Sequence, residues 1–444
     1  MSNFPRYESY KDSGVDWLGK VPGHWEIQKG KWLFVKQDRP VRKEDEIITC
    51  FRDGQVTLRA NRKTEGFTNA LKEHGYQGIR KGDLVIHNMD AFAGAIGVSD
   101  SDGKSTPVYS ACTPRKQNAV NSYFFAYFLR DLAKSGYIES LAKGIRERST
   151  DFRFNDFGEL LLSVPPLSEQ TAIVEFLDRK TAQIEQAIAQ KERLIELLKE
   201  RRQLLIHKAV TRGLNPNVKL KHSGVDWIGE IPAHWAVEKG KWLFQQKKRP
   251  VRNEDEIVTC FRDGVVTLRR NRRTEGFTNA LKEHGYQGIR KGDLVIHNMD
   301  AFAGAIGVSD SDGKATPVYS VCIPKDSKKV NPHFFALLLR KLAKDGFIES
   351  LAKGIRERST DFRFNDFANL VFSVPSISEQ NEIVIYCKEI FQKIETAISC
   401  KQKEIGKLKE YKAVLINSAV TGKIKVCGNS QNAEVKSNYA KSNE

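Results

Sequence analysis

The chain has 444 residues, and 40% of them are hydrophobic, which is enough for sizeable cores in two or three domains. Its 72 lysines and arginines outnumber its 55 aspartates and glutamates, and a net charge of +17 is typical of a protein with a polyanionic partner. No apolar run approaches the ~20 residues that span a membrane, and the N-terminal segment lacks a secretory signal. The seven cysteines have neither CxxC nor zinc-site spacing, so we expect a cytoplasmic protein with free thiols.

The sequence contains two copies of one long segment. Ser13–Trp17 recurs as Ser223–Trp227, and Thr64–Lys104 is identical to Thr274–Lys314, without insertion or deletion between them. Solenoid repeats have periods of about 20–50 residues, so this much longer unit indicates a duplicated domain. We therefore expect a covalent pseudo-dimer.

Each copy begins with a globular part, at residues 11–163 and 221–373. Short strand-like runs such as Asp83–Ile86 and Pro107–Ser110 lie among many glycines, and a helical stretch follows near Phe124–Lys134. This mixture predicts an irregular α/β (α+β) globule.

Each copy then ends in a long helix. Ser168 to Val210 contains no glycine or proline, and the residues that dominate it are good helix formers. Ser168 is the expected N-cap, Glu169 suits the first turn, and Gly213 offers a stop. Such a helix would extend over roughly 64 Å at about 1.5 Å per residue.

Apolar residues follow a heptad pattern along both helices, which predicts a long seam. Basic residues interrupt the seams at matching places, Lys191 and Lys401, and Arg202 and Lys412. We expect the two helices to pair with each other; packing of each helix on its own globule is the alternative. The predicted seam residues are Val174, Leu177, Ile184, Ile188, Ile195, Leu198, Leu205, Val384, Ile394, Ile398, Ile405, Leu408 and Leu415.

Motifs that suggest catalysis are incomplete. Gly97–Ser105 resembles a phosphate-binding P-loop but has five residues between its glycines where four are required. Asn331–Phe334 departs from the Asn-Pro-Pro-Phe signature of adenine methyltransferases at its third position. His87 and His297 follow apolar runs, which favours packing or hydrogen-bonding roles. We therefore expect no catalytic or metal site in this chain alone.

Three polar stretches in each copy are candidates for DNA contact, because arginine and asparagine can bind base edges and lysine secures phosphates. A solvated charged surface would have the same composition. Asp53, Glu147 and Asp151 are candidates for orienting the arginines. The candidate DNA-binding residues are Arg52, Arg59, Arg62, Lys63, Asn88, Lys143, Arg146, Arg148, Arg262, Arg269, Arg270, Arg272, Arg273, Asn298, Lys353, Arg356 and Arg358.

Nearly the whole sequence resembles the specificity subunits of type I restriction–modification enzymes. The resemblance rests on the duplication, on Pro165–Gln170 with its counterpart Pro375–Gln380, and on the opening pattern Trp17 to Trp25. It also rests on the glycine-rich stretch Gly82–Tyr109 and its repeat. Each motif is weak alone, but together, in order and twice, they are specific.

The resemblance implies that each globule is a target-recognition domain that reads half of a bipartite double-stranded DNA sequence. The two helices would form an antiparallel coiled coil with pseudo-twofold symmetry. Two methyltransferase subunits and restriction/translocase subunits would assemble around the chain, which would bind no cofactor; S-adenosylmethionine, ATP and Mg²⁺ would belong to those partners. The expected parts are recognition domains at 1–163 and 213–373, spacer helices at 164–212 and 374–422, and a disordered tail at 423–444.

Because the two globules are nearly identical, we expect a palindromic target with identical inverted half-sites. A modification-only methyltransferase complex would use the same subunit. An autonomous DNA-modifying enzyme and a scaffold or RNA-binding protein are less favoured alternatives.

Overall fold

The computed structural model describes residues 4–62, 75–116, 118–141, 151–272, 285–351 and 361–426. They form two compact units, which we call unit 1 (Met1–Lys191 with Lys403–Glu444) and unit 2 (Glu192–Gln402). Each unit contains one globule and part of each of two long helices, α5 (Leu167–Arg212) and α10 (Ile377–Val420). The boundary between the units therefore falls inside the helices.

The globule of unit 1 mixes short strands and short helices, as the sequence pattern predicted. Its strands are β1 (Tyr10–Asp12), β2 (Lys20–Pro22), β3 (Glu26–Lys29), β4 (Phe34–Gln37), β5 (Ile48–Cys50), β6 (Val56–Leu58), β7 (Gln77–Ile79), β8 (Leu84–His87), β9 (Ile96–Val98), β10 (Gly103–Ser105), β11 (Tyr109–Pro114) and β12 (Leu161–Val164). Its helices are α1 (Gly30–Leu33), α2 (Ser122–Lys134), α3 (Tyr137–Leu141) and α4 (Phe154–Glu159), with 3-10 turns η1 (Arg59–Asn61) and η2 (Ala91–Ala93).

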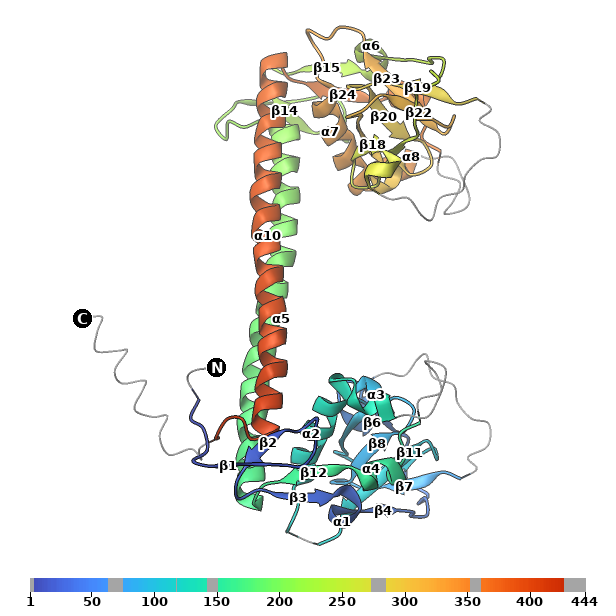
Figure 1. The fold of residues 1–444 in the computed structure, drawn as a ribbon. Coiled ribbons are helices and arrows are strands. Elements are labelled where there is room, and N and C mark those ends of the chain that lie inside the picture. The colour runs from blue at the N-terminus through green and yellow to red at the C-terminus, as the bar shows by residue number, and fades with distance from the viewer. Residues whose placement is uncertain are drawn as a thin grey trace, which may run out of the picture. The chain divides into compact units, whose positions relative to one another are not determined.

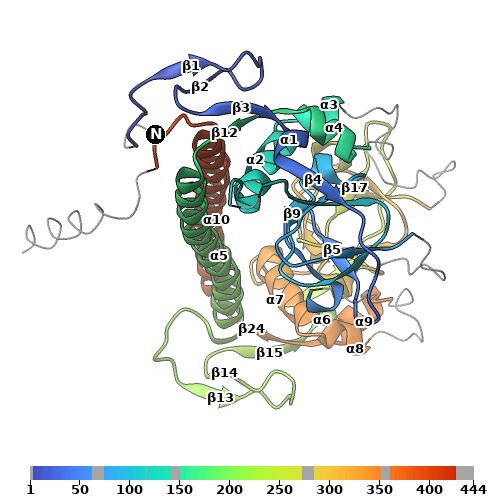
Figure 2. The ribbon, with the colours of Figure 1, turned by 90° about the horizontal axis from the view of Figure 1, so that it is seen from below.

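An antiparallel sheet with the strand order β4-β11-β8-β9 has a core on each face. On β8, Leu84 and Ile86 pack in the core that contains α2, while Val85 packs in a second core with residues of β5 and β6. Successive side chains of a strand point to opposite faces, so this short apolar run is buried on both sides. The β1–β2 hairpin lies apart from this sheet (Figure 2).

Unit 2 repeats this arrangement, with the sheet order β16-β23-β20-β21. Its strands are β13 (Leu220–His222), β14 (Glu230–Pro232), β15 (Ala236–Lys239), β16 (Phe244–Gln246), β17 (Val258–Cys260), β18 (Val266–Leu268), β19 (Gln287–Ile289), β20 (Leu294–His297), β21 (Ile306–Val308), β22 (Gly313–Ala315), β23 (Tyr319–Pro324) and β24 (Val371–Val374). Its helices are α6 (Gly240–Leu243), α7 (Pro332–Lys344), α8 (Phe347–Leu351) and α9 (Phe364–Asn369), with 3-10 turns η3 (Arg269–Asn271) and η4 (Ala301–Ala303).

Within each unit, α5 and α10 run side by side (Figure 1). Every predicted seam residue is buried or half-buried, including Leu177 and Leu415, which are fully buried. The basic residues that interrupt the seam pair with acids on the other helix: Lys191 with Glu404 at 2.5 Å, Lys412 with Glu185, and Arg202 with Glu395. The heptad pattern therefore marked the buried side of each helix, and ion pairs join the two helices beside it.

The predicted N-cap of α5 is wrong by two residues. The carbonyl oxygen of Pro166 accepts hydrogen bonds from the backbone N–H groups of Glu169 and Gln170 at 2.9 and 3.0 Å, so Ser168 lies inside the first turn. In α10 the counterpart of Pro166 is Ser376, and its hydroxyl accepts from the N–H of Glu379 at 3.3 Å. The helix stop was predicted correctly, because Gly213 follows α5 with φ +74°.

The acidic residue in the first turn of each helix binds the globule beside it. In unit 1, Glu169 accepts hydrogen bonds from the indole of Trp25 at 3.1 Å and the hydroxyl of Tyr7 at 3.0 Å. In unit 2, Glu379 accepts from the indole of Trp235 at 3.0 Å. Two motifs that carried the family resemblance therefore hold each other in place.

Unit 1 continues beyond α10 into residues that the sequence assigned to a tail. Ile424 is buried in the core of unit 1, and the backbone N–H of Lys425 donates to the carbonyl of Pro5 at 2.7 Å. The ordered chain therefore extends at least to residue 426. Residues 427–444, the rest of the predicted tail, lie outside the described residues.

Candidate nucleic-acid interface

The turn Phe51–Gln55, between β5 and β6, forms the centre of the candidate interface in unit 1. Gly54 has φ +89°, and a Cβ built on it would lie 2.4 Å from Cζ of Arg130, which reaches the turn from α2. The positive φ favours glycine there, and a side chain at this position would also displace the guanidinium of Arg130. Gly264 and Arg340 repeat this arrangement in unit 2, at φ +86° and 2.5 Å.

An aspartate orients one candidate arginine at this turn. Arg62 donates to Asp53 at 2.9 Å, and its guanidinium lies over the ring of Phe51, 4.4 Å from the centroid. The hydrogen bond from Arg62 holds the pKa of Asp53 below its usual value. Unit 2 repeats the contact between Arg272 and Asp263 at 2.8 Å. Asp53 therefore orients Arg62, which is the role that the sequence suggested for it.

A second arginine brings two candidate stretches together. Arg52 donates to Asp90 at 2.9 Å while 69% of its side chain remains exposed. Arg262 and Asp300 form the same pair, with the same distance and exposure. The turn at residues 51–55 and the turn at residues 87–90, which are separate in sequence, therefore present one surface.

The other described arginines of these stretches differ in burial and in their hydrogen-bond or ion-pair partners. Arg59 is half-buried and donates from Nε to the hydroxyl of Thr49 at 3.2 Å, and Arg269 repeats this contact. Arg270, whose counterpart is Ala60, pairs with Glu256 at 2.7 Å and is mostly exposed. The candidates outside the described residues are Lys63, Lys143, Arg146, Arg148, Arg273, Lys353, Arg356 and Arg358.

Asn88 and its counterpart Asn298 are placed differently from the arginines. Asn88 is buried, and its side-chain oxygen accepts a hydrogen bond from the hydroxyl of Ser110 at 2.9 Å. Ser320 makes the same bond to Asn298 at 2.8 Å. These amides therefore stabilise the turn after β8, and the neighbouring Met89 is the exposed residue of that turn, at 46%.

A recess beside this turn contains residues that the sequence did not single out. Its volume is about 690 Å³ in unit 1 and about 900 Å³ in unit 2. Arg153 lies at its edge, 71% exposed and paired with Asp151 at 2.5 Å, and Arg363 repeats this arrangement. The shared lining is Asn88, Met89, Pro107, Val108, Ser110, Asp151, Arg153, Phe154 and Asn155, with counterparts Asn298, Met299, Pro317, Val318, Ser320, Asp361, Arg363, Phe364 and Asn365.

Identity between the copies is the signal by which this recess could have been found. Residues 138–157 repeat without change at 348–367, and α4 and α9 begin within those blocks. The short helices carry Phe154 and Asn155 into the recess next to residues that follow β8. The contact between these segments depends on the tertiary fold, so the repeat alone did not predict that they lie next to each other.

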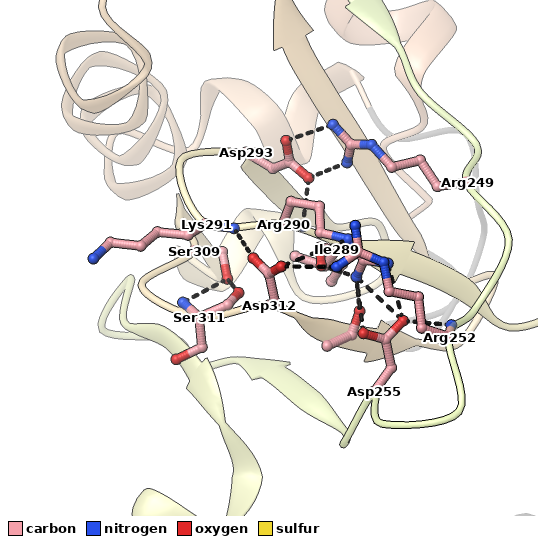
Figure 3. A network of polar contacts seen from close by, with 11 residues as sticks. Arg249, Arg252, Asp255, Ile289, Arg290, Lys291, Asp293, Ser309, Ser311 and Asp312 are labelled. Carbon is pink, nitrogen blue, oxygen red and sulfur yellow. Dashed lines mark hydrogen bonds and ion pairs between the residues drawn. The ribbon is translucent and has the colours of Figure 1, made fainter.

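Several other arginines serve the fold and not the exposed surface. In unit 2, Arg290 donates to the buried Asp255 at 3.0 Å, and Arg249 donates to the buried Asp293 at 3.1 Å (Figure 3). Asp312 accepts from the backbone N–H of Lys291 at 2.9 Å in the same network (Figure 3). Part of the basic content therefore neutralises buried carboxylates, as buried charges require.

The histidines that follow β8 and β20 have structural contacts. Nδ1 of His87 accepts from the backbone N–H of Asp90 at 3.1 Å, and its ring packs edge-on against Tyr109. Burial lowers the pKa of His87, and it also lowers the pKa of His297 in unit 2. In the part of the chain that the structure describes, no group of three or more His, Cys, Asp or Glu residues is arranged to hold a metal ion.

The described ranges contain six cysteines, and all six are free thiols. None of the helices in those ranges is long and apolar enough to cross a membrane.

Two curated proteins resemble this chain in sequence. The specificity subunit of the type I restriction enzyme EcoBI from Escherichia coli is 26% identical over 257 residues, which is 52% of either chain. A Methanocaldococcus jannaschii protein, provisionally named the type I restriction enzyme MjaX specificity subunit, is 22% identical over 96% of this chain and 99% of its own. The match to the Escherichia coli subunit thus spans about half of that protein. A scan against models of protein families found no match.

Two solved structures share the fold. A chain from a structure described as the complex assembly and conformational transition of the type I R-M system aligns with a TM-score of 0.63, at 16% identity, over 90% of this chain and 98% of its own. The HsdS subunit from Thermoanaerobacter tengcongensis aligns with a TM-score of 0.54, at 16% identity, over 91% and 98%.

Proposed function

We propose that this chain, a member of the type I restriction specificity-subunit family, is the DNA-recognition subunit of a type I restriction–modification complex and has no catalytic site of its own. The observation that carries the proposal is the duplicated arginine surface. In each copy one arginine is paired with an aspartate and mostly exposed, and a second is held over a phenylalanine ring. Arginines held in this way suit base and phosphate contacts, since little side-chain freedom is lost on binding.

The target is a bipartite, palindromic sequence of double-stranded DNA, one half-site for each globule. Arg52 and Arg262 have the same partner type, distance and exposure, which supports identical readout by the two globules. Gln55, whose counterpart is Val265, is the clearest difference at the recognition turn. If that position contacts a base, the two half-sites will differ by one base pair.

An antiparallel coiled coil of α5 and α10, with pseudo-twofold symmetry, spaces the half-sites. Equivalent ion pairs in the two units support this arrangement: Glu185 with Lys412 in unit 1, and Glu395 with Arg202 in unit 2. Each helix supplies the acid of one pair and the base of the other, as a twofold relation requires. In this proposal the chain consists of recognition domains at 1–163 and 213–373 and spacer helices at 164–212 and 374–422.

The chemistry belongs to partner subunits. Two methyltransferase subunits, which use S-adenosylmethionine, methylate adenines in the target, and restriction/translocase subunits, which use ATP and Mg²⁺, join for cleavage. The complex acts on DNA in the cytoplasm. Similarity to a specificity subunit of a type I restriction enzyme, and to a chain from a structure of complex assembly in a type I system, supports assembly with other subunits.

A genome-wide adenine-methylation map tests the proposal. Cells that express this chain with its neighbouring methyltransferase are compared with cells that lack the chain, and a gapped palindromic motif is expected only in the former. An asymmetric motif would keep the recognition function and reject the symmetry. Absence of any motif, with the complex shown to assemble, would reject the recognition function itself.

The double variant Arg52→Ala/Arg262→Ala connects the methylation map to the proposed surface. If these arginines contact bases, the motif should lose discrimination at the same position of both half-sites, at about 1–3 kcal/mol each. Glu8→Ala, at an exposed acidic residue outside the interface, is the control and should leave the motif unchanged.

A further inference from the structure

Unit 2 contains a large pocket whose lining includes Gly264 and Arg340 of the candidate interface, but whose other residues the proposed DNA recognition does not use. It lies between α7, the last turns of α5 and the first turns of α10, and its volume is about 810 Å³. This is within the range of small-molecule sites, roughly 300–1,000 Å³. Its walls include Leu204 and Phe391, which are 69% and 49% exposed, so a large apolar surface remains open to solvent.

Cationic side chains surround this apolar surface. Arg202, Arg340, Lys341, Lys344 and Lys388 all line the pocket. Two carboxylates, Glu200 and Asp345, also line it. Lys341 pairs with Asp345 at 2.9 Å and Arg202 with Glu395, which leaves the lining with an excess of positive charge.

The cations are close enough to oppose one another. Burial, and then the charges of Arg340 and Arg202, lower the pKa of Lys344. Burial, and then the charge of Lys388, lowers the pKa of His333, another residue of the lining. An anion in the pocket would relieve this repulsion, because it would offset charges that the protein brings together without enough acids.

At the equivalent position in unit 1, hydrogen bonds join α2 to α5 and to α10. The hydroxyl of Tyr127 on α2 donates to Asp178 at 2.6 Å, and the amide of Asn417 donates to Asp131 at 2.7 Å. Thr181, buried at 8% exposure, occupies the place of the exposed Phe391.

The counterparts of Tyr127 and Asp178 in unit 2 are Leu337 and Lys388. A leucine and a lysine cannot form the hydrogen bond that joins α2 to α5 in unit 1. The aspartate Asp131 is likewise replaced by Lys341. Two acids have thus become two bases at the place where the pocket opens.

We propose that unit 2 binds a small amphipathic anion in this pocket, one that carries a carboxylate, sulfonate or phosphate on an aromatic or aliphatic body. The apolar body contacts Leu204, Leu337 and Phe391, and the anionic group contacts Lys344 and Lys388. The inference does not depend on DNA recognition, and in unit 1 the bonded pair Tyr127 and Asp178 stands at the positions of Leu337 and Lys388.

A fluorescence titration of the full chain with 8-anilinonaphthalene-1-sulfonate, an aromatic sulfonate, tests the proposal. The wild-type protein should bind this probe, and dodecanoate should displace it. Leu337→Tyr/Lys388→Asp, which installs the residues of unit 1, should weaken binding at least about tenfold, equivalent to 1.4 kcal/mol. The matched variant Tyr127→Leu/Asp178→Lys should create a second site in unit 1.

Thermal melts identify variants that fail to fold. If the Leu337→Tyr/Lys388→Asp variant fails to fold, Lys388→Met, which keeps the apolar stem of the side chain, is used in its place. Equal probe binding by the wild type and a folded pocket variant would overturn the proposal. Displacement by a DNA duplex but not by dodecanoate would also overturn it, because the cations would then serve the DNA backbone. Loss of DNA binding in the Arg52→Ala/Arg262→Ala variant with unchanged probe binding would separate the two sites.

Discussion

The two copies of the repeat agree at the turns Phe51–Gln55 and Phe261–Val265 except for Gln55 and Val265, and they also differ where each globule meets the long helices. Residues 64–104 and 138–157 of the first copy recur unchanged in the second, and Arg52 and Arg262 keep the same partner and distance. On α2 and α7, by contrast, Tyr127 becomes Leu337 and Asp131 becomes Lys341. Residues that contact the same ligand in both copies must keep the same side-chain atoms. Residues that pack a helix need only be complementary to the side chains they contact.

The largest expected effect concerns the helix seam, where the copies should behave alike. Ile188→Glu or Ile398→Glu would place a charge in the apolar seam, which should lower the free energy of unfolding by about 3 kcal/mol or more for each change. Chemical denaturation of the two single variants measures this. A large difference between them would mean that the seam is not used equally.

Ile385→Glu is the matched control, because Ile385 lies on α10 but is 58% exposed. It should change stability by no more than about 0.5 kcal/mol. Unchanged melting of the Ile188→Glu/Ile398→Glu double variant would contradict the pairing of the helices.

The next effect compares Glu169 and Glu379, the acidic residues in the first turns of α5 and α10 that bind the globules. Glu169→Ala leaves the donors of Trp25 and Tyr7 without their acceptor, which should cost about 1–3 kcal/mol. Glu379→Ala should cost about 1 kcal/mol less, because the position of Tyr7 is occupied by Asn217 in the second copy. Thermal denaturation of both variants, with the glutamine variants as conservative controls, measures the difference. Equal losses would remove the proposed contribution of Tyr7.

A third effect separates structural from DNA-contacting residues within one surface. Asn88→Ala should lower stability by about 1–2 kcal/mol, because the buried hydroxyl of Ser110 loses its acceptor. Arg153→Ala, at a residue that is 71% exposed, should change stability by no more than about 0.5 kcal/mol. Its effect should appear in DNA affinity, measured by fluorescence anisotropy with a duplex that contains the methylated motif. The opposite pattern would reverse these assignments.

The smallest effect concerns Arg270, which has no basic counterpart at Ala60. If it contacts a phosphate, Arg270→Ala should reduce the slope of log K against log salt by about one and leave the target sequence unchanged. Ala60→Arg should raise the slope by the same amount. A slope that does not change would show that the pair with Glu256 keeps Arg270 from the DNA.

Much of the fold was predictable because it follows periodic patterns. The heptads marked residues such as Leu177 and Leu415 that are buried in the core of unit 1, and Gly213 was recognised as a helix stop. The start of α5 was not predicted correctly, since Pro166 supplies its capping interaction through a backbone carbonyl that is independent of side-chain type. The mixed pattern of the globules was also correct, although it did not specify the order of the strands.

The candidate site was predictable only in part. Arg52 and Arg62 are on the surface as expected. Asn88, by contrast, is buried, and its side-chain oxygen accepts a hydrogen bond from the hydroxyl of Ser110. In sequence, an asparagine in a polar turn looks the same whether its amide faces a ligand or a neighbouring strand. Arg153 was missed because its position beside Met89 arises from a contact between distant segments.

The sequence by itself determined the duplication, the long helices and the family, because repeats, heptads and motif order are properties of the chain in one dimension. Only the tertiary structure decided which polar groups face outward, which arginines neutralise buried carboxylates, and which residues line the pocket of unit 2. The physical reason is that a side chain's role depends on the partners that folding brings within a few ångströms. Tyr127 donates a hydrogen bond to Asp178 in unit 1, whereas their counterparts Leu337 and Lys388 cannot form this bond and line the pocket of unit 2.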